Sequence, residues 1–167
     1  MKALVFSDSH GASRNIGRAL AMHPDVEVVF FLGDGLSDVS GFINSDPAKA
    51  WLCVRGNCDY TGTVSGFSVE KTASITLMNK KIVYTHGDLY GVKYGYDGVI
   101  RLAEERTADI VLFGHTHVRT EKYIPTERGG IYLFNPGSIG ISYGSAASYG
   151  IIDLSEKGIL LSHGELD

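Results

Sequence analysis

Short apolar runs, each ending in glycine or polar residues, dominate the first part of this chain. Runs of four or five such residues are typical of buried strands. Two intervening segments, residues 13–22 and 96–105, carry apolar residues at helical spacing. Strands that alternate with helices predict an α/β fold. The strands expected from these runs are residues 3–6, 28–32, 50–54, 82–85 and 110–113.

Three later runs, residues 131–134, 149–154 and 159–162, have no helical pattern between them, so we expect mixed or antiparallel pairing there. Glu156-Lys157-Gly158 predicts a hairpin between the last two. Ser13 is expected to cap the helix that begins there. The sequence contains no linker, repeat or low-complexity tract, and 167 residues suit a single domain over residues 1–167.

Composition excludes several classes of protein. The hydrophobic fraction of 44% and charged fraction of 20% are ordinary for a globular domain. No apolar run approaches the ~18 residues of a membrane span, so no membrane partner is expected. A net charge of −4 disfavours a nucleic-acid polymer as partner. Two cysteines are too few for a secreted disulfide framework, so a cytoplasmic location is expected.

Polar clusters follow the five early runs, and ligands bind at the carboxyl ends of strands in open α/β sheets. These clusters should therefore converge at one edge. In chain order they are Asp8-Ser9-His10, Gly33-Asp34, Gly56-Asn57-Cys58-Asp59, His86-Gly87-Asp88 and Gly114-His115-Thr116-His117.

Seven side chains in these clusters are oxygen or imidazole donors, a set that suits divalent transition metals. Seven donors exceed one tetrahedral site but fit two ions of higher coordination number. Two metals about 3.5–4 Å apart are a common apparatus for phosphoester cleavage. Taken alone, each histidine is compatible with an ordinary surface or core residue, and Asp8, Asp34 and Asn57 are compatible with turn or cap residues, whereas the ordered set favours a metal centre. The expected metal ligands are Asp8, His10, Asp34, Asn57, His86, His115 and His117.

The clusters resemble the calcineurin-like metallophosphoesterase family, whose pattern is D-x-H, G-D, G-N-[HC]-[DE], H and G-H-x-H. Asn135-Pro136-Gly137-Ser138 resembles its short bacterial and archaeal phosphodiesterase branch. The resemblance implies two mixed β-sheets packed as a sandwich and flanked by helices, in four layers. It also implies two divalent metal ions; we expect Mn²⁺, with Ni, Fe, Zn, Co or Mg as alternatives.

The resemblance also implies a role for each ligand. Asp8, His10 and His117 would bind the first metal and Asn57, His86 and His115 the second, with Asp34 bridging both. A metal-bridging hydroxide would attack phosphorus in line. The residues expected to be catalytic are Asp34, Asn57 and His86.

Three residues of the clusters are expected to contact either the ligands or the substrate: Cys58, Asp59 and Asp88. Many family members carry His where this chain has Cys58. A thiol, with a reference pKa of about 8.5, replaces imidazole poorly at neutral pH, so weak leaving-group assistance is expected. Relatives often carry a second His where this chain has Asp88, which would either orient a ligating His or repel an anionic substrate. A nucleophilic role for Cys58 is less favoured, because the nearby histidines serve better as metal ligands.

The sequence thus predicts a metal-dependent hydrolase acting on small phosphodiesters. The main alternative is a catalytically weak scaffold that binds a protein partner, as in a scaffold subunit of a membrane-trafficking coat with this fold. A nuclease is disfavoured by the charge and the lack of basic runs. The resemblance allows a homo-oligomer, and loop tyrosines leave room for its contacts: Tyr60, Tyr90, Tyr94, Tyr96 and Tyr143. The remaining histidines, His23 and His163, are expected to lie outside the site.

Overall fold

The computed structural model describes residues 1–127, 129–140 and 146–167, so Tyr143 lies outside the described residues. One five-stranded sheet has the order β12-β11-β1-β2-β3. β1 pairs in parallel with β2 and antiparallel with β11, so this sheet is mixed. Its strands are β1 (Lys2–Phe6), β2 (Val28–Phe31), β3 (Ala50–Cys53), β11 (Ala147–Ser155) and β12 (Gly158–Leu166).

The second five-stranded sheet has the order β6-β7-β8-β10-β9 and is also mixed, because β7, β8 and β10 run parallel while β6 and β9 are antiparallel to their neighbours. Its strands are β6 (Thr72–Leu77), β7 (Lys80–Thr85), β8 (Ile110–Leu112), β9 (Thr120–Ile124) and β10 (Ile131–Asn135). A small two-stranded sheet pairs β4 (Thr63–Val64) with β5 (Phe67–Ser68).

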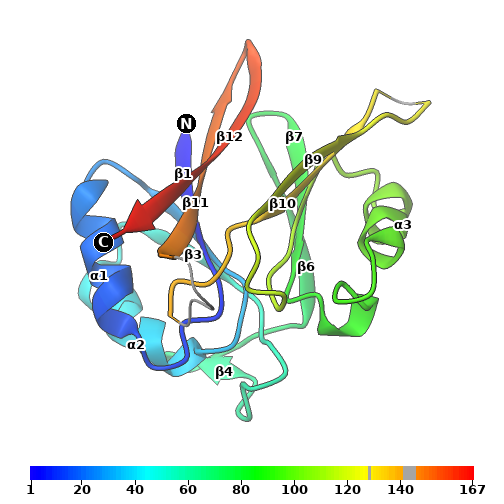
Figure 1. Ribbon diagram of the computed structural model, residues 1–167. Coiled ribbons are helices and arrows are strands. Elements are labelled where there is room, and N and C mark those ends of the chain that lie inside the picture. Colours follow the sequence, from blue (N-terminus) through cyan, green and yellow to red (C-terminus); the bar gives the residue numbers. More distant parts are fainter. Residues whose placement is uncertain (128, 141–145) are drawn as a thin grey trace.

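Helices cover the outer face of each large sheet (Figure 1). α1 (Ser13–Met22) and α2 (Leu36–Ser45) lie on the left in this view, beside the first sheet. α3 (Asp97–Glu105) lies on the right, beside the second, near the short 3-10 helix η1 (Asp88–Tyr90). The expected four-layer arrangement is confirmed. None of the described helices has the length and apolar content needed to cross a membrane.

The period-two alternation of strand side chains builds these layers. In β1, Ala3 and Val5 face the other sheet and join a core between the two sheets. Leu4 and Phe6 point the opposite way and pack with Ile16 of α1. A third apolar cluster joins the second sheet to α3. β1 is therefore buried on both faces, which explains its uninterrupted apolar run.

The structure confirms the predicted strands and helices, and most of their ends lie within one or two residues of the expected positions. The hairpin is also confirmed, since Ser155 pairs with Gly158. The expectation that Ser13 caps α1 was wrong: no cap hydrogen bond from a side chain is present at this end, and Ala12 precedes the helix. The Ala12 N–H donates to the Ser9 carbonyl, so the preceding turn leads directly into the helix.

The sequence analysis missed α2 and four strands, β4, β5, β6 and β9. α2 contains Gly41 and several Ser and Asn residues, which have low helix propensity. β9 exposes three consecutive residues, 121–123, and therefore has no clear apolar pattern. β6 does alternate, with Ala73, Ile75 and Leu77 packed against the core and Ser74 and Thr76 exposed, and the sequence analysis overlooked this period-two signal.

Candidate metal centre

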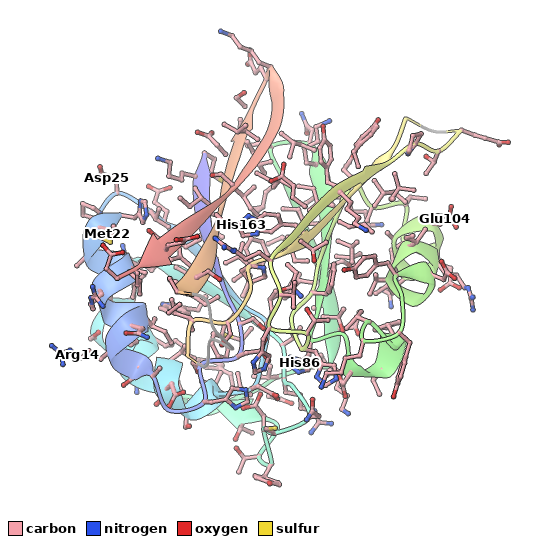
Figure 2. The ribbon with its side chains drawn as sticks, viewed as in Figure 1. Arg14, Met22, Asp25, His86, Glu104 and His163 are labelled. Carbon is pink, nitrogen blue, oxygen red and sulfur yellow. The ribbon has the colours of Figure 1, made fainter. Side chains whose placement is uncertain are left out.

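The seven predicted donors converge where the loops after β1, β2, β3, β7 and β8 meet. Figure 2 shows this region around His86, in the lower centre of the view. Five of the seven donors have a left-handed backbone, with φ values between 44° and 66°. Such conformations cost about 1–3 kcal/mol each and cluster at functional sites. The residues concerned are Asp8, His10, Asp34, His115 and His117.

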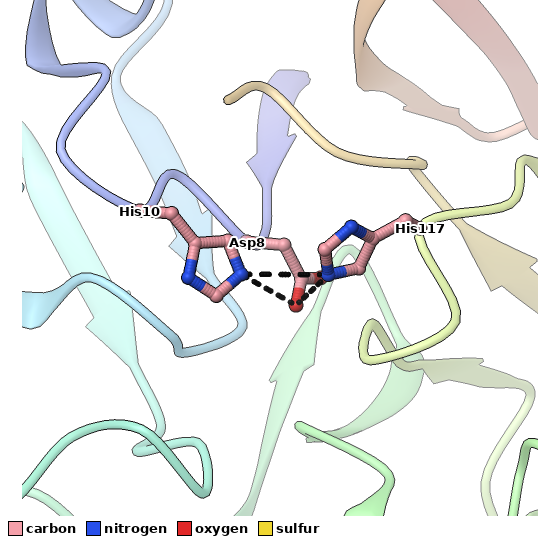
Figure 3. A group of neighbouring side chains, drawn as sticks. All are labelled: Asp8, His10 and His117. Atoms are coloured by element: carbon pink, nitrogen blue, oxygen red, sulfur yellow. Dashed lines mark hydrogen bonds and ion pairs between the residues drawn. The ribbon is translucent and has the colours of Figure 1, made fainter. Parts of the chain in front are cut away.

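Asp8, His10 and His117 form the first ligand group (Figure 3). Asp8 Oδ1 lies 3.2 Å from His117 Nε2 and 3.9 Å from His10 Nε2. The Asp8 side chain is fully buried, and this oxygen has no hydrogen-bond partner among the described residues. A buried carboxylate oxygen that accepts no hydrogen bond and faces two imidazoles needs a proton or a cation beside it, so the group fits a metal.

Asp8 is held through its other oxygen. Ser7 Oγ donates to Asp8 Oδ2 at 2.5 Å and the His115 N–H donates to it at 3.0 Å. Gly114 must be glycine here, because a Cβ would overlap Ser7 Oγ and approach Asp8 Oδ2 to 2.8 Å. The loop after β8 therefore fixes the carboxylate that the loop after β1 supplies.

Asp34, His86 and His115 form the second ligand group, with Asn57 beside it. His86 Nε2 lies 3.1 Å from His115 Nδ1, 3.2 Å from Asn57 Oδ1 and 3.4 Å from Asp34 Oδ2. Nδ1 of His86 lies 2.8 Å from the Leu32 carbonyl, which can only accept. Nδ1 therefore carries a proton, so Nε2 is the nitrogen that would bind a cation once it has lost its own proton.

Neighbouring charges shift the pKa values within this group. Burial would raise the pKa of Asp34, but the hydrogen bond and charge of His86 and the Cys58 N–H hold it well below its usual range. Burial opposes charging of His86, yet Asp34 and Asp8 raise its pKa. Desolvation, and then the charges of His86 and Lys93, lower the pKa of His115. A cation would take over the role that the His86 proton plays between the two carboxylates.

Asp59 holds the backbone that carries Asp34. Its Oδ2 accepts from the N–H groups of Asp34 and Gly56, both at 2.8 Å. Its Oδ1 accepts from Gly35 and Leu36, both at 2.9 Å, at the start of α2. A Cβ on Gly56 would overlap Asp34 Oδ1. Asp59 thus joins the loops after β2 and β3.

Cys58 and Asp88, both expected to contact either the ligands or the substrate, have different partners in the structure. The Cys58 N–H donates to Asp34 Oδ1 at 2.8 Å, and Asn57 Nδ2 donates to Cys58 Sγ at 3.3 Å. Desolvation and hydrogen bonding to Asp34 raise the pKa of this exposed thiol. Asp88 pairs with Lys71, at 3.8 Å. Its carboxylate is thereby partly neutralised.

Sequence reasoning missed several residues that position the ligands. Asp38 Oδ2 accepts from Ser9 Oγ at 2.6 Å and from the Gly11 N–H at 2.8 Å, which fixes the loop around His10. Asn135 Nδ2 donates to the Gly114 carbonyl at 2.9 Å. Of these residues, only Asn135 could have been found from the sequence, through the Asn135-Pro136-Gly137-Ser138 motif. Asp38 had no such signal, because it lies in α2, the helix that was not predicted.

The two histidines expected outside the site contact other residues. His23 Nε2 lies 2.9 Å from Tyr149 Oη. His163 Nε2 lies 2.8 Å from the Asn135 carbonyl, and Figure 2 shows His163 well above His86. Since a carbonyl can only accept, His163 donates here and supports the segment that contains Asn135.

Two bacterial proteins are similar to this chain over most of its length. Over 140 residues the chain is 33% identical to the probable metallophosphoesterase YsnB of Bacillus subtilis strain 168, covering 83% of this chain and 75% of that protein. Over 173 residues it is 29% identical to the phosphodiesterase YfcE of Escherichia coli K12, covering 92% and 88%.

Solved structures share the fold. A conserved Streptococcus pneumoniae TIGR4 protein, described as a predicted phosphoesterase, superposes with a TM-score of 0.79 at 24% identity, covering 98% of this chain and 88% of that chain. Zinc-complexed Vps29 of Entamoeba histolytica gives 0.74 at 17% identity, covering 99% of each chain. A family model, the calcineurin-like phosphoesterase superfamily domain, matches residues 1–157. This chain therefore belongs to the calcineurin-like phosphoesterase superfamily.

Proposed function

We propose that this protein is a binuclear metal-dependent phosphodiesterase that hydrolyses small phosphodiesters. The observation that carries the proposal is the position of Asp34 between the two ligand groups. Its Oδ2 lies 3.4 Å from His86 Nε2 in the second group and 4.0 Å from His10 Nε2 in the first. A carboxylate in this position can bridge two cations, as paired-metal phosphoesterases require.

Residues of this chain would hold and orient the two ions. Asp8, His10 and His117 would bind one, and Asn57, His86 and His115 the other. When bound, such ions supply a nucleophile from water at neutral pH and offset the charge that develops on the phosphoryl oxygens. The Leu32 carbonyl fixes the His86 tautomer, and the Ser7 hydroxyl and His115 N–H fix Asp8.

The raised pKa of Cys58 supports a preference for good leaving groups. A thiol with a raised pKa gives up its proton less readily than imidazolium, so protonation of a departing alkoxide by Cys58 would be weak. Cys58→His should therefore raise turnover of an alkyl ester more than turnover of a nitrophenyl ester. Equal effects on both substrates would contradict this assignment.

Hydrolysis of bis(p-nitrophenyl) phosphate by metal-stripped protein, before and after addition of Mn²⁺, tests the function. We expect turnover that returns with Mn²⁺, together with binding of two ions per chain. Asp34→Asn, an isosteric change that Asn tolerates at positive φ, is the matched control and should stay inactive. A fully active Asp34→Asn protein would refute the two-metal proposal.

The fold-level likeness to Vps29 favours one second candidate, a scaffold that binds a protein partner. All seven donor positions are retained and assembled here, which supports the enzyme over a purely structural role. Absence of turnover with Mn²⁺, Ni²⁺ and Zn²⁺ would favour the scaffold. Three expectations stay predictions from the sequence: a single domain, a homo-oligomer and a cytoplasmic location. Analytical ultracentrifugation would test whether the chain forms a homo-oligomer.

A further inference from the structure

A third set of metal-ligating atoms overlaps the two groups already described. Cys58 Sγ, a ring nitrogen of His10 and a carboxylate oxygen of Asp34 all lie within 4.8 Å of one another. They come from the loops after β3, β1 and β2 respectively. Neither ligand set assigned to the binuclear centre includes the thiol.

The surroundings of Cys58 aim its sulfur at these neighbours. The Cys58 N–H donates to Asp34 Oδ1, and Asn57 Nδ2 donates to the sulfur. The Asp34 side chain is only 4% exposed, whereas the thiol is exposed, so an ion in solvent can reach it. The buried Asp8 Oδ1 accepts no hydrogen bond from the described residues and lies 3.9 Å from His10 Nε2, so its charge adds further attraction for a cation.

This third set contains a sulfur atom, so it is a softer set of ligands than the two sets of the binuclear centre, which contain only oxygen and nitrogen. Thiolate selects soft or borderline ions, whereas Mn²⁺ and Mg²⁺ favour oxygen ligands. We propose that Cys58, His10 and Asp34 form an inhibitory site for a thiophilic divalent ion such as Cd²⁺. The thiol proton passes to solvent when the ion binds, and no redox change is involved.

Inhibition follows from shared ligands. An ion at Cys58 takes His10 from the first metal and Asp34 from the bridging position, so this site and the complete binuclear centre cannot be filled together. The binding claim is independent of the proposed function. The claim of inhibition rests on it, because it needs a metal-dependent activity to inhibit.

The experiment titrates metal-stripped protein with Cd²⁺ and follows the ultraviolet sulfur-to-cadmium charge-transfer band. We expect the band in the wild type, its loss in Cys58→Ala and its retention in Cys53→Ala. Cys53 is the matched control because it lies in β3, and burial raises its pKa to about 12. Loss of a residue that only hydrogen-bonds to a metal ligand weakens metal binding by at least about tenfold. Cys58→Ala removes a direct ligand, so Cd²⁺ affinity should fall by more than that.

Persistence of the band in Cys58→Ala, or its absence while Cd²⁺ binds the wild type, would overturn the proposal. The second arm measures how strongly Cd²⁺ inhibits Mn²⁺-supported turnover in each variant, relative to that variant's own uninhibited rate. Relief in Cys58→Ala supports inhibition, and equal inhibition refutes it. A wild type with the band but no turnover would reject the proposed function and keep the thiol site.

Discussion

Replacing Asp59 with asparagine tests how the loops after β2 and β3 are held. In the native protein each carboxylate oxygen accepts two backbone N–H groups, between 2.8 and 2.9 Å. Asparagine keeps one accepting oxygen and replaces the other with an NH2 group. That NH2 would face two N–H donors, so two hydrogen bonds are lost and their donors are left without an acceptor.

The magnitude follows from these two bonds. A hydrogen bond to a charged group contributes about 1.5–3 kcal/mol, which gives about 3–6 kcal/mol for two. Asp59 is partly exposed and water can reach some of the donors, so we expect the lower end, about 3 kcal/mol. For a domain of this size that corresponds to a fall in Tm of about 6–12 °C.

Thermal denaturation of the metal-free protein, followed by circular dichroism, measures the effect. Asp25→Asn, the same substitution at an exposed position, is the control and should shift Tm by less than about 2 °C. Because Asp59 carries the backbone of Asp34, Mn²⁺ affinity should also fall by about 10–100-fold, measured by calorimetry. A Tm shift no larger than that of the control would show that Asp59 does not join these loops.

Three further outcomes are expected. His86→Ala should reduce the Mn²⁺ stoichiometry from two to one per chain, measured by elemental analysis; unchanged stoichiometry would contradict its assignment. Ellman's reagent should label Cys58 rapidly in the native protein and Cys53 only after unfolding, because burial raises the pKa of Cys53; fast labelling of both thiols in the native protein would be inconsistent with this. Asn135→Ala removes buried bonds to Gly114, Thr116 and Gly137 and should lower Tm by about 6–12 °C, from about 1 kcal/mol per bond; a Tm within about 2 °C of wild type would refute this role.

Most of the strands, two of the helices and the convergence of the donors at one edge could be predicted because they depend on local pattern, whereas the four-layer sandwich was implied only by the family resemblance. Continuous apolar runs such as residues 3–6 mark strands buried on both faces, and the polar residues after them must reach one edge. The function of Asp59 was left open, since acceptance of four backbone N–H groups depends on how two loops approach each other. Asp38 could not be predicted, because its helix has weak propensity and contacts a loop 27 residues earlier.

The left-handed backbones of the ligands have a consequence for how this fold can change over time. Folding must overcome the strain at Asp8, His10, Asp34, His115 and His117, and binding of metal at the proposed centre would compensate for it. A glycine at His117 would remove a ligand and relieve local strain at once, because glycine adopts φ near 59° freely. Selection for stability alone would thus favour loss of the centre while the sandwich persists. In this architecture the proposed metal centre and the stability of the fold therefore make opposite demands on the same five residues.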